Sequence, residues 1–105
     1  MIIEFAQLSI RPGSERQFEA AFPEAIKVLG GSRGYLSHEL RRSMETPNRY
    51  ALIVQWQTIE DHTVGFRGSP AFTQWRASIG PFLESAPVVE HFQAVAGADS
   101  NRIGR

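Results

Sequence analysis

The sequence contains no cysteine, which excludes disulfides, thiolate nucleophiles, and zinc or iron–sulfur sites built from cysteine alone. Its formal net charge at pH 7 is zero, with 11 basic and 11 acidic residues. The basic residues are scattered and form no run, so we expect neither a nucleic acid nor an anionic membrane surface as a partner. No apolar run approaches the roughly 20 residues that a membrane-spanning helix needs.

The N-terminal segment MIIEFAQLSI lacks the basic region of a signal peptide and carries Glu4 inside its apolar run. Together with the absence of cysteine, this favours a cytoplasmic location. The length of 105 residues is typical of one domain. We expect that domain to cover residues 1–97, followed by a polar, flexible tail over residues 98–105.

Four segments rich in β-branched and aromatic residues predict strands, bounded by glycine, proline and asparagine. They cover residues 2–10, 34–43, 49–57 and 88–96. The second and third lie on either side of a short turn and should form a hairpin. Alternation places Tyr35 on the opposite face of its strand from His38.

Apolar residues at helical spacing predict helices between these strands. Ser14, with Gln17 three residues later, predicts a capping box at the start of the first helix. Pro23 should kink or locally break that helix, because it lacks a backbone donor. A short helix is expected after Thr58, and another should begin at Ser69–Pro70.

The order strand, helix, strand, strand, helices, strand predicts an α+β, ferredoxin-like βαββαβ fold. Its four-stranded antiparallel sheet should have the order 4-1-3-2, with the helices on one face. A sheet covered on one face should alternate apolar and polar residues. The first strand instead has Ile3 and Phe5 on one side and Leu8 and Ile10 on the other. We therefore expect a homodimer in which two sheets pack face to face.

The motif order RPG, GYLSHEL, ALIVQW, FRGSPAFTQWR and PVVEHF resembles the antibiotic biosynthesis monooxygenase family. That family belongs to the dimeric α/β-barrel, ferredoxin-like superfamily, and the resemblance extends over residues 2–95. It implies a cofactor-independent monooxygenase, without metal or flavin, that acts on a small aromatic phenol, anthrone or hydroquinone. The substrate would be deprotonated, and its carbanion would give an electron to molecular oxygen. The protein would supply positioning, a base, oxyanion stabilisation and a dry pocket.

Two alternatives remain open, and with them whether the chain is an enzyme. The first is a non-catalytic dimer that binds a small molecule or serves a stress response, because fold does not fix function. The second is haem degradation. Haem-degrading relatives have an asparagine late in the first strand, a tryptophan in the helix after the third strand, and a histidine beyond it. The aligned positions here are Ala6, Gly65 and Arg76, so haem degradation is disfavoured.

His62 is the candidate catalytic base. It shares the inward side of a short helix with Ile59 and Phe66, and an imidazole near its usual pKa can accept a phenolic proton at neutral pH. The alternative is a histidine that only packs or caps locally. Arg76, like Arg67, could stabilise an oxyanion or could form a surface ion pair.

Aromatic side chains are expected to bind a planar substrate. These candidates are Trp56, Phe66, Phe72, Trp75 and Tyr35. The alternative for the helical aromatics is ordinary core packing, which needs the same spacing. Tyr35 could equally cover the seam of the dimer.

Three further polar residues lie on predicted strands. His38 and His91 fall on the two edge strands, roughly 14 Å apart across three strand spacings, so they cannot share a metal within one chain. We expect structural roles for both. Glu4 is either a base in the pocket or the partner of a residue on the fourth strand or on a second chain, because a buried carboxylate needs a partner.

Overall fold

The computed structural model describes residues 1–100. Its main elements are β1 (Ile2–Ser9), α1 (Glu15–Ile26), β2 (Tyr35–Arg42), β3 (Arg49–Trp56), α2 (Pro70–Ile79) and β4 (Val88–Gln93). Short helical segments lie between them: η1 (Lys27–Gly31), η2 (Asp61–Phe66) and η3 (Gly80–Phe82). In the described part of the chain, no helix has the length and apolarity to cross a membrane. The expected flexible tail, residues 98–105, includes residues 101–105, which lie outside the described residues, and it stays a prediction.

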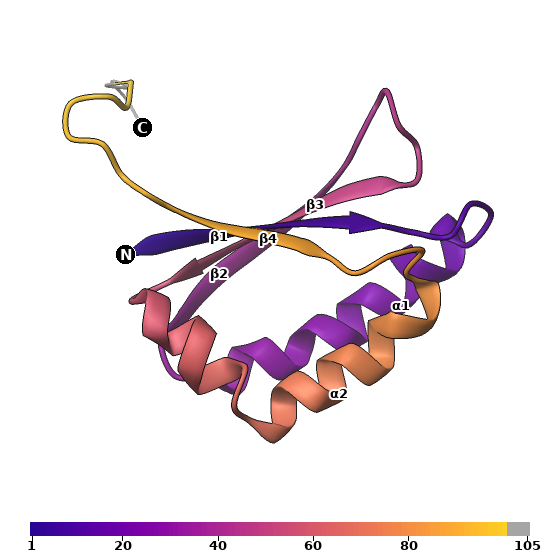
Figure 1. Cartoon of the computed structure of the whole chain (residues 1–105), viewed down its shortest axis with the longest axis horizontal. Coiled ribbons are helices and arrows are strands. Elements are labelled where there is room, and N and C mark those ends of the chain that lie inside the picture. Colours follow the sequence, from indigo (N-terminus) through magenta and orange to yellow (C-terminus); the bar gives the residue numbers. More distant parts are fainter. Residues whose placement is uncertain (101–105) are drawn as a thin grey trace.

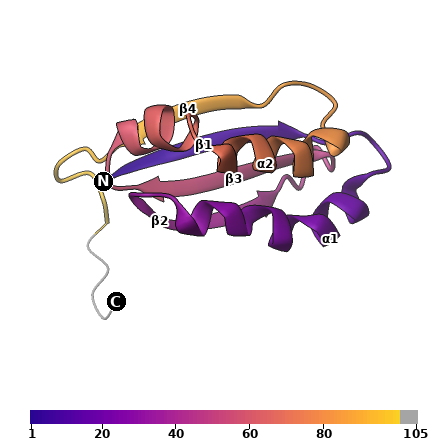
Figure 2. The same cartoon turned by 90° about the horizontal axis from the view of Figure 1, so that it is seen from below.

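The four strands form one antiparallel sheet in the order β2-β3-β1-β4. This is the predicted order 4-1-3-2 read from the other edge, and the ferredoxin-like α+β fold is confirmed. Helices α1 and α2 run along one face of the sheet, and within residues 1–100 no helix covers the opposite face (Figure 1). Seen from the helix side, η2 lies near β4 and the start of β1 (Figure 2).

The two central strands bury alternate side chains. On β3, the residues from Tyr50 to Trp56 that face the helices are 0–2% exposed, and they pack with Phe18 of α1. The other face of the sheet carries half-buried apolar side chains, such as Ile3, Phe5 and Ile53. The core therefore lies between sheet and helices, and a second apolar surface lies on the bare face.

Two expectations about α1 are wrong. The Ser14 side chain makes no capping hydrogen bond; the backbone N–H of Gly13 instead donates to Oε1 of Glu15 at 2.9 Å. The local break expected at Pro23 does not occur, since α1 continues to Ile26, whereas a kink there stays a prediction. Pro23 is exposed, so the carbonyl that loses its intrahelical donor can be hydrated and the helix tolerates the loss.

The predicted face of Tyr35 is also wrong. The pairing of β2 with β3 shifts between Tyr35 and Ser37, so that Tyr35 lies opposite Trp56. This irregularity turns the Tyr35 side chain to the same face as His38, and its hydroxyl hydrogen-bonds Nδ1 of His38 at 2.6 Å. A bulge adds one residue to a strand, and a simple alternation of faces cannot anticipate it.

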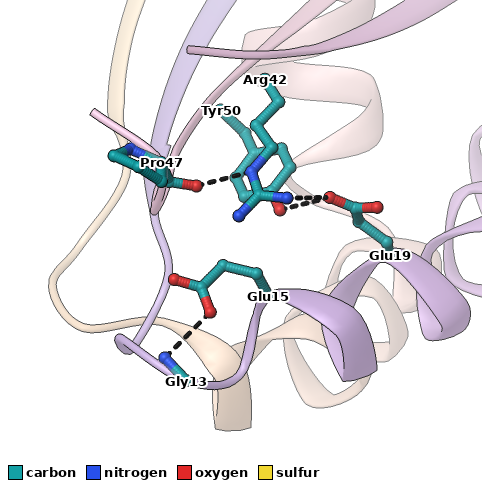
Figure 3. A network of polar contacts seen from close by, with 6 residues as sticks. All are labelled: Gly13, Glu15, Glu19, Arg42, Pro47 and Tyr50. Carbon is teal, nitrogen blue, oxygen red and sulfur yellow. Dashed lines mark hydrogen bonds and ion pairs between the residues drawn. The ribbon is translucent and has the colours of Figure 1, made fainter. Parts of the chain in front are cut away.

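A polar network holds α1 against the β2–β3 hairpin (Figure 3). The carboxylate of Glu19 accepts hydrogen bonds from the Tyr50 hydroxyl at 2.5 Å and from Nη1 of Arg42 at 3.3 Å. Nε of Arg42 donates to the carbonyl of Pro47 in the hairpin turn at 2.7 Å. Burial, together with the Glu19 carboxylate, raises the pKa of Tyr50 well above its usual range, so the hydroxyl is a permanent donor.

Replacement of Tyr50 by phenylalanine tests this network. Tyr50→Phe keeps the buried ring and removes the donor to a carboxylate, so we expect a loss of about 1.5–3 kcal/mol in the free energy of unfolding. In a Glu19→Ala background the same substitution should cost less, because its partner is already gone. Urea titrations of the four proteins measure both costs, and equal costs in the two backgrounds would contradict the network.

Candidate active site

A cavity of about 460 Å³ lies between the helix-covered face of the sheet and α2. Apolar side chains make most of its wall, among them Leu8, Leu52, Phe66, Phe72, Trp75 and Ile79. Its charged or titratable side chains are Glu4, His62, Arg67, Arg76 and Glu84. A concave apolar space with a few polar groups is the usual form of a small-molecule site.

His62 owes its position to η2, a π-helical segment. The backbone N–H of Arg67 donates to the carbonyl of His62, five residues earlier, at 3.0 Å. The segment is capped reciprocally, because the Asp61 N–H donates to Oγ1 of Thr58 and the Thr58 N–H donates to the Asp61 carboxylate, both at 3.2 Å. The predicted cap at Thr58 is therefore confirmed. Single π turns occur often at functional sites, where they re-aim a side chain.

Gly34 allows η2 to pack against the start of β2. Its φ is +81°, a conformation that side-chain-bearing residues rarely adopt, and a Cβ at this position would collide with the Asp61 carboxylate. The Gly34 carbonyl also accepts a hydrogen bond from the Gln57 N–H at 2.8 Å. Gly34 thus contacts the segment leading to His62 at two points, Gln57 and Asp61.

Glu4 places a carboxylate on the core face of the central strand β1. It is 7% exposed and lies between Ile2 and Ala6 on that face. The indole Nε1–H of Trp56, a fully buried residue at the end of β3, donates to its Oε1 at 3.0 Å. The cavity thus contains a carboxylate that is almost dry and held by a neutral donor.

His62 and His91 extend this contact into a chain of polar groups. Nε2 of His62 lies 3.4 Å from Oε1 of Glu4, and Nδ1 of His62 hydrogen-bonds Nε2 of His91 at 2.8 Å. The His62 ring also stacks on Trp56, with 5.4 Å between ring centroids. Both ring nitrogens of His62 therefore have a partner, and the ring is fixed in orientation.

Burial shifts the pKa values of Glu4, His62 and His91. It raises the pKa of Glu4, although the Trp56 hydrogen bond and the charge of Arg67 act in the opposite direction. It lowers the pKa of His62 to about 4, and the charges of His91 and Arg67 add to this effect. Burial and Arg67 also lower the pKa of His91. His62 is consequently neutral at pH 7, and its contact with Glu4 is a polar contact rather than an ion pair.

Two arginines lie close to the Phe72 ring at the cavity. The guanidinium carbon of Arg67 is 5.9 Å from the centre of the Phe72 ring, and that of Arg76 is 5.7 Å from it. Both arginines are exposed and line the cavity, so they can supply positive charge to an anion bound there.

The structure brings together most of the residues singled out from the sequence. Phe66, Phe72, Trp75, Arg76 and His62 all line the cavity. The other two candidates lie elsewhere, as described next.

Trp56 lies behind His62 and outside the cavity lining, where its indole holds Glu4. Tyr35 is also outside the lining and borders a separate surface groove with His38. The contact of His91 with His62 was missed, although strand parity contained a signal for it. Glu4 and His91 are paired across β1 and β4, and Glu4 has the parity of the buried Ala6.

His38 and His91 lie on β2 and β4, the two edges of the sheet, as predicted. Among the described residues, no group of three or more histidine, aspartate or glutamate side chains is arranged to hold a metal ion. His62 and His91 instead hydrogen-bond each other through facing nitrogens.

A sequence model described as "Antibiotic biosynthesis monooxygenase" matches residues 1–78. The chain belongs to the antibiotic biosynthesis monooxygenase family. It is also 45% identical over 95 residues to the uncharacterized protein YczJ of Bacillus subtilis, which covers 90% of this chain and 100% of YczJ. The resemblance inferred from the sequence motifs is thus confirmed.

Solved structures give the same assignment to the antibiotic biosynthesis monooxygenase family. A Bordetella bronchiseptica protein classed with these monooxygenases is 39% identical, with a TM-score of 0.86 over 90% of this chain and 96% of that one. SnoaB, a cofactor-independent oxygenase from Streptomyces nogalater, is 17% identical, with a TM-score of 0.77 over 94% of this chain and 97% of SnoaB. At that identity the similarity to SnoaB shows the shared fold.

The lowered pKa of His62 predicts how stability depends on pH. The unfolded chain binds a proton near pH 6.5 and the folded chain only near pH 4, so acidification through this window favours unfolding. Relative to a His62→Gln variant, the wild type should lose about 2–3 kcal/mol of unfolding free energy between pH 7 and pH 4. The comparison with His62→Gln matters because the raised pKa of Glu4 acts in the opposite sense in both proteins. Urea titrations across this range measure the difference, and a constant difference would contradict burial of a neutral His62.

Proposed function

We propose that this member of the family is a cofactor-independent monooxygenase acting on a small aromatic phenol, anthrone or hydroquinone. One observation carries the proposal: a nearly dry carboxylate, Glu4, and a neutral imidazole, His62, meet in an apolar cavity of about 460 Å³. A desolvated carboxylate with a raised pKa is a stronger base than one in water.

The proposed reaction needs a base, a dry site and positive charge. For an anthrone, the Glu4–His62 pair would remove a proton from the ring CH₂ group, leaving a carbanion conjugated with the phenolic ring. The carbanion would pass one electron to O₂, and the two radicals would combine to a peroxide. Loss of water from the peroxide converts the CH₂ group to a carbonyl, so one O₂ gives one ketone oxygen and one water.

The remaining candidate residues have roles in the same scheme. Phe66, Phe72 and Trp75 would hold the flat substrate by their apolar surfaces and exclude water. Arg76, together with Arg67, which is also close to the Phe72 ring, would stabilise the oxyanion of the deprotonated substrate. Trp56 would act from behind, through its hydrogen bond to Glu4.

Oxygen consumption tests the proposal. Chelator-treated protein is mixed with a panel of anthrones and dihydroquinones while dissolved O₂ is recorded. We expect uptake that falls about 10²–10⁴-fold in Glu4→Gln and in His62→Gln, the range typical of a lost general base. Glu45→Gln is the matched control, because Glu45 is exposed in the β2–β3 turn. Uptake unaffected by both site substitutions would contradict the assigned base.

A non-catalytic, ligand-binding protein is the second candidate function. The observation that favours it is that both ring nitrogens of His62 already have partners, as in a purely structural polar network. Quenching of tryptophan fluorescence would report binding of the same aromatic compounds. Binding without oxygen uptake would support this function over the oxygenase. Haem belongs in the panel, and a Soret shift upon mixing would revive the disfavoured haem-degrading alternative.

We also propose that the protein is a cytoplasmic homodimer in which the bare faces of two sheets pack together. That face presents Ile3, Phe5 and Ile53, which are only half-buried in a single chain, and the exposed ring of Phe92. Removal of this apolar surface from water would be the driving force for association.

Light scattering at micromolar concentration should therefore give the mass of a dimer. Ile53→Glu should give a monomer, because it would bury a charge in the interface. Met44→Glu, in the exposed hairpin turn, is the matched control and should leave the dimer intact. A wild-type monomer would refute the proposed assembly.

A further inference from the structure

His91 lies next to the proposed base but outside the lining of the cavity. It is half-buried on the edge strand β4, directly opposite Glu4 in the β1–β4 register. Its Nε2 is 2.8 Å from Nδ1 of His62, a well-formed hydrogen-bond distance. His91 therefore contacts the site through His62, and the tautomers of the two rings determine which of the facing nitrogens donates.

The positions of the donors favour one arrangement of protons. A neutral imidazole has one N–H and one lone pair. If the proton of His62 is on Nδ1, the lone pair on Nε2 faces the oxygen of Glu4 at 3.4 Å, and an ionised Glu4 repels it. If the proton is on Nε2, it lies between that nitrogen and the nearby Glu4 oxygen, which attracts it, and Nδ1 accepts from the Nε2–H of His91.

We propose that His91 is a positioning residue, which donates from Nε2 to His62 and so holds His62 in the tautomer that donates from Nε2 to Glu4. In this arrangement Trp56 and His62 both donate to the ionised carboxylate of Glu4, and His91 donates to His62. All the described contacts to that carboxylate use Oε1, which leaves Oε2 to approach a proton of the substrate. This catalytic consequence depends on the proposed oxygenase function, whereas the tautomer does not.

The charged groups around the chain of contacts come from several elements. Arg67, just after η2, contributes positive charge that favours ionised Glu4 and disfavours protonation of both histidines. Arg76 of α2 and Glu84, before β4, also line the cavity. Trp56 on β3 is a neutral donor with a hydrogen bond to Glu4, and among the described residues His62 makes a further polar contact with the same oxygen at 3.4 Å while it hydrogen-bonds His91.

Two substitutions of His91 distinguish hydrogen-bond donation from packing. His91→Gln keeps an N–H donor at about the distance of Nε2, whereas His91→Leu keeps bulk and removes the donor. ¹⁵N NMR of the histidine rings at neutral pH should show His62 protonated on Nε2 in the wild type and in His91→Gln. In His91→Leu, the Nδ1–H tautomer should become populated.

The steady-state kinetics of the same variants are measured with the compound that gives oxygen uptake. Loss of the donor should lower kcat about ten- to hundredfold in His91→Leu, the cost typical of a lost supporting hydrogen bond. KM should change little, and the acid limb of the kcat profile should move to higher pH, because Glu4 loses a donor that favours its ionised form. His91→Gln should restore both.

Each outcome bears on the proposal. An Nδ1–H tautomer of His62 in the wild type would overturn it, and so would identical behaviour of the leucine and glutamine variants. The NMR result stands without any substrate, so failure of the oxygenase function and failure of the positioning role are distinguishable. Circular dichroism checks the fold of His91→Leu; if that variant is unfolded, the wild-type tautomer alone decides.

Discussion

Burial of the Glu4 carboxylate is the constraint on which the site depends. Transfer of a carboxylate from water into a nearly dry cavity is costly unless donors replace its hydration. Side chains from two other elements contact it: Trp56 of β3 donates a hydrogen bond to Oε1, and Nε2 of His62 of η2 lies 3.4 Å from the same atom. His91 of β4 hydrogen-bonds the other ring nitrogen of His62. The pairing of β1 with β4, the π turn of η2 and the close approach of Gly34 to Asp61 together position the side chains around Oε1 of Glu4.

The sheet imposes a second requirement. Since β1 is central, the side chain of Glu4 on its core face is almost out of contact with solvent, and it borders the cavity. Strand alternation leaves Ile3 and Phe5 on the bare face. Strand β1 thus places Glu4 in the cavity and Ile3 and Phe5 on the opposite surface. Because side chains alternate along β1, the same strand forms part of the site and of the proposed interface.

Much of the fold follows from the sequence because local patterns determine it. Strand alternation, helical spacing and the right-handed crossover rule together gave the order of all four strands correctly. The errors lie where one local interaction replaces the average pattern. Gly13, rather than the Ser14 side chain, bonds at the start of α1, the exposed Pro23 is tolerated, and a bulge turns Tyr35 to the helix face.

The site was only half predictable for a different reason. His62, Phe66 and Trp75 face inward because of helical spacing, which is a local property of the sequence. The contact between His62 and His91 joins residues 29 positions apart, and it depends on strand register combined with a π turn. Neither feature has a sequence signal strong enough to place two ring nitrogens within hydrogen-bond distance.

The protonation states of the site argue for chemistry at Glu4 rather than at the isolated imidazole. With a pKa of about 4, His62 is a weaker base at pH 7 than an ordinary histidine. The raised pKa of Glu4 makes its carboxylate a stronger base than usual, and the neutral imidazole beside it can donate without adding charge. A glutamine at this position would accept the same hydrogen bond from Trp56 without the cost of desolvating a charge. What the carboxylate adds is the capacity to take a proton, so its presence in an apolar cavity weighs towards a base and against a purely structural network.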